Sequence, residues 1–114
     1  MGVADNEHWL NREGQAISAG RNCSADEADG ALLPIERLIE VVWQVSRSMR
    51  RHGDLVGVRE DDPAYLEDGL AMATQLDLPL AKEVLSAGEG GLERRFFELF
   101  DDLVLELRGL RSLP

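Results

Sequence analysis

The sequence has little of what disulfide, metal and most catalytic chemistry requires. It contains one cysteine, Cys23, so no disulfide can form within the chain. Its two histidines, His8 and His52, lie in none of the usual zinc-binding spacings, such as C-x-x-C or H-E-x-x-H. Neither histidine follows a glutamate by three residues, the spacing found in di-iron helical bundles. We therefore expect no metal ion and no other cofactor.

Long hydrophobic runs are also missing. No apolar stretch approaches the roughly 20 residues that a membrane-spanning helix needs. The segment from Met1 to Asn11 is polar and acidic and lacks the basic and apolar regions of an ordinary signal peptide. We expect a cytoplasmic protein with no membrane partner.

Basic residues are scarce relative to acidic ones. The chain has 12 Lys and Arg against 22 Asp and Glu, a formal net charge of −10. Such a charge favours solubility and repels phosphate backbones, which argues against direct binding of nucleic acid. A helix–turn–helix drawn over residues 63–87 would carry only Lys82 on its reading helix, which is a poor DNA reader.

Four of the basic residues form the one basic region of the sequence, Arg47, Arg50, Arg51 and Arg59. We expect them to complement the end of a helix and to pair with the acidic segment 61–68. The alternative is that they bind an acidic partner.

Aromatic residues are few, at 5%. One of them, Trp9, lies in residues 1–30, a stretch rich in polar and small residues without a sustained apolar period. We interpret 1–30 as an irregular or flexible N-terminal arm and 31–114 as the folded domain. The alternative for Trp9 is an anchor that docks on the protein or on a partner, because one tryptophan buries a large area.

Helical signals dominate the rest of the chain, and no strand pattern of useful length occurs. Start signals, stop signals and apolar spacing predict helices over 34–52, 63–76, 80–87 and 92–110. Residues 54–60 are predicted to be a connector with a short extended turn, and residues 87–91 a glycine-rich loop. Pro79 either kinks one helix or separates two. The predicted fold class is all-α, a small bundle of three to five helices with an irregular N-terminal arm.

The last predicted helix has more apolar surface than one bundle face needs. A continuous seam runs from Leu92 to Leu110, and Phe97, Val104 and Leu105 extend it to the sides. We expect these three residues to contribute to a homodimer interface.

The same helix carries a cluster of acids, Glu98, Asp101, Asp102 and Glu106. Glu98-x-x-Asp101 matches half of the acidic pattern that all-α nucleotide pyrophosphatases use to hold magnesium, but no E-x-x-E accompanies it. A solvated helix face is the simplest interpretation. The alternative is a partner surface, because like charges four residues apart destabilise a helix.

Taken together, these features predict a non-catalytic protein-binding module of bacterial or phage origin. It would act as an adaptor, an inhibitor or a chaperone, or mimic nucleic acid to block a basic groove. Its partner would be a protein with a basic surface. The expected contacts are Glu98, Asp101, Asp102, Glu106, Asp61, Asp62 and Trp9. A homodimeric structural protein is the alternative function, and a metal-dependent small hydrolase ranks below both.

Overall fold

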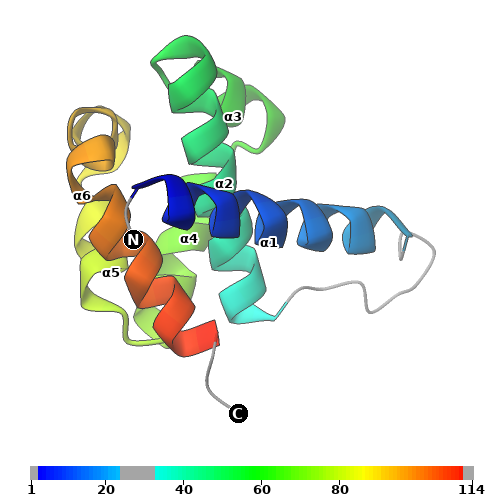
Figure 1. The fold of residues 1–114 in the computed structure, drawn as a ribbon. Coiled ribbons are helices and arrows are strands. Elements are labelled where there is room, and N and C mark those ends of the chain that lie inside the picture. The colour runs from blue at the N-terminus through cyan, green and yellow to red at the C-terminus, as the bar shows by residue number, and fades with distance from the viewer. Residues whose placement is uncertain (1–2, 24–32, 112–114) are drawn as a thin grey trace.

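The computed structural model describes residues 3–23 and 33–111, and these residues form helices joined by short turns (Figure 1). The six helices of the described ranges are α1 Val3–Cys23, α2 Pro34–His52, α3 Val56–Asp61, α4 Tyr65–Gln75, α5 Pro79–Ser86 and α6 Gly88–Arg111. The predicted all-α class is confirmed, and the predicted count of three to five helices is too low.

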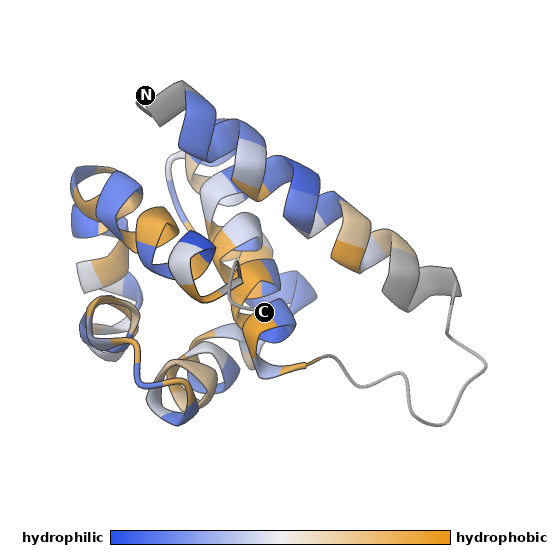
Figure 2. Cartoon of the chain, turned by 60° about the horizontal axis from the view of Figure 1, so that its bottom comes forward, coloured by the Kyte–Doolittle hydropathy of each residue, from blue (hydrophilic) through white to orange (hydrophobic). Residues whose placement is uncertain are grey.

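Helix α2 is the central element of the fold, and its predicted bounds are confirmed. Pro34 occupies its first turn, and Gly53 follows its end in the left-handed conformation, with φ of 75°. Helices α1, α3, α4 and α6 all pack against it. Its apolar side chains, such as Leu38, Ile39 and Val42, are fully buried, and Figure 2 shows apolar segments of several helices turned towards the interior.

The N-terminal stretch is a helix from Val3 to Cys23, so the prediction of an irregular arm is wrong for these residues. Residues 24–30 of that predicted arm lie outside the described residues. Over residues 5–19 of α1, where burial is described, the buried positions fall on one helical stripe, Asn6, Leu10, Gly14 and Ile17. Two of these four are Asn and Gly, which a search for apolar periodicity does not count.

Gly14 is buried because α1 crosses α2 at Trp43. A Cβ built on Gly14 would overlap the Trp43 indole and would lie 2.7 Å from the Trp43 Cβ. Only glycine therefore lets the two helices approach this closely. Leu10 and Ile17, one turn to either side, belong to the same apolar core as α2 and α6.

The turns after α2 differ from expectation in two places. The predicted connector 54–60 contains α3, whose first turn is supported by Asp54, a carboxylate that accepts the Val56 N–H at 3.2 Å. The predicted loop 87–91 is mostly the first turn of α6, and Gly88, at φ of 82°, makes the sharp turn from α5. Pro79 opens α5 and so separates two helices.

No helix in the described part of the chain combines the length and the apolar character needed to cross a membrane.

Candidate functional site

The most exposed apolar surface of α6 consists of two residues, Phe97 and Leu105. They are 49% and 50% exposed, whereas Val104 between them in sequence is 0% exposed. The buried side of the helix is formed by Leu92, Phe96, Phe100, Leu103, Val104 and Leu107. Val104 is thus a core residue and is not available to a second copy, unlike the other two residues of the predicted interface.

Phe97 lies at the edge of this surface, next to the start of α1. The guanidinium of Arg50 lies 5.1 Å from the ring centroids of both Phe97 and Phe100. Arg50 also pairs with Glu7 of α1, at 3.4 Å. A cation over an aromatic face is attracted to the ring electrons, so Arg50 fixes one side of Phe97 and leaves the other side open to solvent.

The four acids of the predicted cluster on α6 divide into two exposed and two engaged residues. Glu98 and Asp102 are exposed and lie one helical turn apart. Asp101 accepts a hydrogen bond from the Asn6 side chain at 2.9 Å. Glu106 accepts the backbone N–H groups of Leu80 and Ala81 in the first turn of α5, at 3.1 and 2.9 Å.

The role of Glu106 follows from the start of α5. Residue Leu78 precedes that helix and offers no side-chain acceptor, so the first N–H groups of α5 need a partner from elsewhere. The Glu106 carboxylate supplies it and also faces the positive end of the helix dipole. This role favours a structural interpretation of Glu106 over a partner contact.

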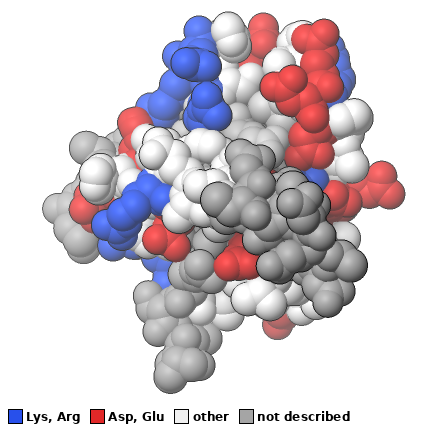
Figure 3. Space-filling view, turned by 90° about the vertical axis from the view of Figure 1, so that its right-hand side faces the viewer, with Lys and Arg blue, Asp and Glu red and all other residues white. Residues whose placement is uncertain are grey.

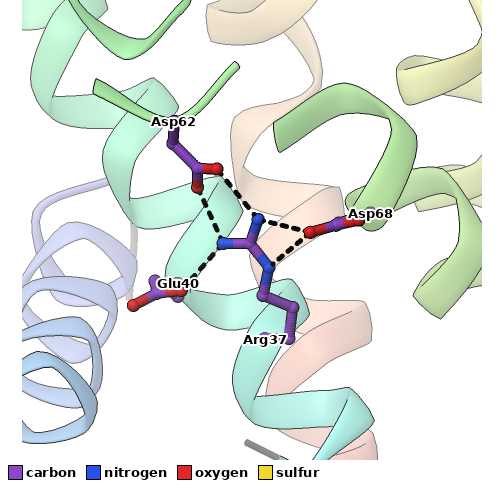
Figure 4. A network of polar contacts seen from close by, with 4 residues as sticks. All are labelled: Arg37, Glu40, Asp62 and Asp68. Atoms are coloured by element: carbon purple, nitrogen blue, oxygen red, sulfur yellow. Dashed lines mark hydrogen bonds and ion pairs between the residues drawn. The ribbon is translucent and has the colours of Figure 1, made fainter. Parts of the chain in front are cut away.

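The acids of segment 61–68 are organised by a residue that sequence reasoning missed, Arg37 of α2 (Figure 4). Its guanidinium donates five hydrogen bonds to three carboxylates, those of Glu40, Asp62 and Asp68, at 2.7 to 3.3 Å. A guanidinium has five N–H groups, so this one is fully used. The network ties α2 to α4 and to the turn that precedes it.

The surrounding carboxylates keep the Arg37 guanidinium charged. Burial by itself lowers the pKa of Arg37, but the hydrogen bonds to Asp62 and Asp68 outweigh burial and hold this pKa above its ordinary value. Asp62, a predicted partner contact, is engaged here, while its neighbour Asp61 is exposed. Apolar periodicity does not reveal Arg37, because it is a charged residue at a buried position of an amphipathic helix.

The arginines that were expected to pair with segment 61–68 have other neighbours. Arg59 pairs with Glu89 at 2.9 Å, and Arg50 pairs with Glu7. In the part of the chain that the structure describes, Arg47 and Arg51 make no ion pair. The expected pairing is therefore wrong for these four residues.

The two tryptophans both pack on the protein. Trp9 is half-buried against the core, and the Arg108 guanidinium lies 5.7 Å from its ring centroid. Arg108 also donates to Asp5 and Asn6, at 3.0 and 2.9 Å, which fastens the start of α1 to α6. Trp9 is thus placed as an anchor on the protein's own body.

Among residues 3–23 and 33–111, no group of three or more His, Cys, Asp or Glu side chains is arranged to hold a metal ion. Comparison of the chain with models of protein families, with curated proteins and with solved structures found no match.

Proposed function

We propose that this protein is a small, cytoplasmic, non-catalytic binding module whose contact surface is the exposed side of α6. The observation that carries the proposal is the pair Phe97 and Leu105, both half-exposed on a helix whose other large apolar side chains are covered. Exposed aromatic and aliphatic side chains flanked by charges are typical of partner surfaces.

The chemistry of the partner follows from the acids beside these residues. Glu98 and Asp102 lie about two turns and one turn before Leu105 on the solvent side of α6, and the whole chain carries a net charge of −10. A partner that combines an apolar pocket with basic residues would complement both features. We expect a protein of this kind, bound in the manner of an adaptor, an inhibitor or a chaperone.

Mimicry of nucleic acid is a narrower version of this proposal, and it has less support. It needs a long row of free carboxylates in place of phosphates. Asp101 and Glu106 of α6 are engaged by Asn6 and by α5, and Asp62 and Asp68 are engaged by Arg37. The free acids of α6 therefore form a pair beside apolar residues, which fits a mixed protein surface better.

A homodimer is the alternative, because a second copy could cover the same two apolar side chains. Suppose two α6 helices pair antiparallel about a two-fold axis, with Phe97 of each against Leu105 of the other. Asp101, which lies midway between the two, would then meet its own copy on the axis. Like charges facing each other oppose association, so a different protein is favoured as the partner.

Capture of partners from the native cells tests the proposal. The bait proteins are the wild type, the double variant Phe97→Ser/Leu105→Ser and the control Val56→Ser, which changes an exposed apolar residue of α3. We expect one protein to bind the wild type and the control but not the double variant. Its association with the purified wild type should slow as salt rises.

Two results would contradict the proposal. One is that every captured protein binds the double variant as well as the wild type. The other is light scattering that shows a wild-type dimer and a monomeric double variant, which would favour the homodimer.

A further inference from the structure

A cleft of about 410 Å³ is lined by none of the residues of α6. It opens between α1, the second half of α2, and α3. Its walls include Ser18 of α1, Trp43, Arg47 and Arg51 of α2, and Asp61 of α3. The volume is within the range of small-molecule sites, and the lining is largely polar.

Trp43, which lines the cleft, carries a buried hydrogen-bond donor without an acceptor. Trp43 is 7% exposed, and its indole Nε1 is fully buried with no hydrogen-bond partner. Buried tryptophan N–H groups usually find an acceptor, because an unpaired buried donor destabilises the fold. Among the buried side-chain nitrogens and oxygens of the described residues, this is the one atom left without a partner.

The same wall carries two positive charges. Arg47 and Arg51 lie one turn apart on α2, both exposed, and neither makes an ion pair with a described residue. The Arg47 guanidinium lies 4.9 Å from the centroid of the Trp43 ring, so this charge lies over an indole that lines the cleft.

The negative charges of the cleft, those of Asp61 and Asp62, lie at the end of α3, across from the α2 wall. Asp62 lines the cleft but is bound by Arg37, and Asp61 is exposed on α3. On the face shown in Figure 3, basic side chains gather at the upper left and acidic ones at the upper right, with uncharged residues between them. An anion would therefore find its place at the α2 wall.

We propose that this cleft binds a small anion through a carboxylate or phosphate group. Arg47 and Arg51 supply the positive charge and directional N–H donors, and the Trp43 indole forms the wall beside Arg47. The site is separate from the surface of α6 and does not depend on the function proposed for it.

The two indole N–H signals of the protein allow a direct test by nuclear magnetic resonance. Trp43 reports on the cleft, and Trp9, which lies away from it, serves as an internal control; the variant Trp9→Phe assigns the two signals. Inorganic phosphate and succinate are titrated separately to millimolar concentrations, with sodium chloride at matched ionic strength as the reference. We expect a saturable shift of the Trp43 signal with phosphate, succinate or both, and no shift of Trp9. The stronger of the two anions identifies the group that the cleft prefers.

Variants establish which residues bind. Arg47→Gln/Arg51→Gln should weaken binding at least about tenfold, because the anion loses a charged hydrogen bond from each arginine. Arg94→Gln, at an exposed position of α6, should leave binding unchanged. Three outcomes would overturn the proposal: no Trp43 shift with either anion, an equal shift with chloride, or binding that the double variant retains in full.

Discussion

The carboxylate of Glu106, near the end of α6, accepts the backbone N–H of Ala81, 25 residues earlier in the chain, at 2.9 Å and so caps the start of α5. This contact decides how one acid of the α6 cluster is used. Glu106 stabilises the fold, whereas Asp102, one turn before it, faces solvent.

We predict that Glu106→Ala lowers the free energy of unfolding by about 1 to 2 kcal/mol, the usual cost of losing a helix cap. Chemical denaturation measures this value. Asp102→Ala is the matched control and should stay within about 0.5 kcal/mol of the wild type. Equal effects of the two substitutions would show that the cap contributes no specific stability.

The crossing of α1 and α2 gives a second prediction. Gly14→Ala should destabilise the protein by about 1 to 3 kcal/mol, because the added methyl overlaps a rigid indole and the helices must separate. Alanine is otherwise the better helix former by up to about 1 kcal/mol. Gly109→Ala, in α6 with open space around it, should therefore stabilise the protein, and thermal melts of the two variants should move in opposite directions.

The Arg37 network gives a third prediction. Arg37→Met removes the cation shared by the carboxylates of Glu40, Asp62 and Asp68 and should cost about 2 to 4 kcal/mol of stability. Arg94→Met, at an exposed position, should change stability little. A loss for Arg37→Met no greater than for this control would show that the network is energetically neutral.

Tyr65 gives a prediction for alkaline pH. Burial, followed by the hydrogen bond that its hydroxyl donates to Glu89 at 2.9 Å, raises the pKa of Tyr65 above its ordinary value of about 10. The unfolded chain then releases this proton at lower pH than the folded chain. The contribution of Tyr65 to stability is therefore complete below pH 10 and is lost as pH rises beyond it.

The measurement is simplified because Tyr65 is the single tyrosine of the sequence. Tyrosinate absorbance should appear at higher pH in the folded protein than in denaturant. Stability between pH ~9 and pH ~11 should fall more steeply for the wild type than for Tyr65→Phe, which has no phenol to ionise. Parallel declines of the two proteins would contradict the assignment.

The helices that could be predicted from sequence are those with both apolar periodicity and end signals. Residues 34–52 have both, and their bounds agree with α2. Helix α1 was missed because its buried stripe includes Asn6 and Gly14. Asn6 is buried where it hydrogen-bonds with Asp101 and Arg108, and Gly14 is buried where it contacts Trp43. The local sequence of α1 does not predict these contacts, because their partners lie in distant segments of the chain.

The candidate site was predictable only in part, for the same reason. The surplus of apolar residues on α6 was correctly read, but periodicity could not distinguish Val104, which is buried, from Leu105, which is exposed. The acids of that helix looked equivalent in sequence. Their division into free and engaged residues depends on α1 and α5, which the pattern of α6 alone does not specify.

The attachment of α1 to α6 has a practical consequence for every fusion made with this protein. Asn6 bonds to Asp101, and Glu7 pairs with the arginine that lies over the ring of Phe97, so the first turns of α1 lie beside α6 and the proposed contact surface (Figure 1). A tag or reporter joined ahead of α1 would be tethered there and could mask it. The end of α6 is no farther away, because Leu110 lies five residues beyond Leu105, about 7.5 Å at 1.5 Å per residue. A fusion at either end of the folded part therefore needs a long flexible linker to keep this surface accessible.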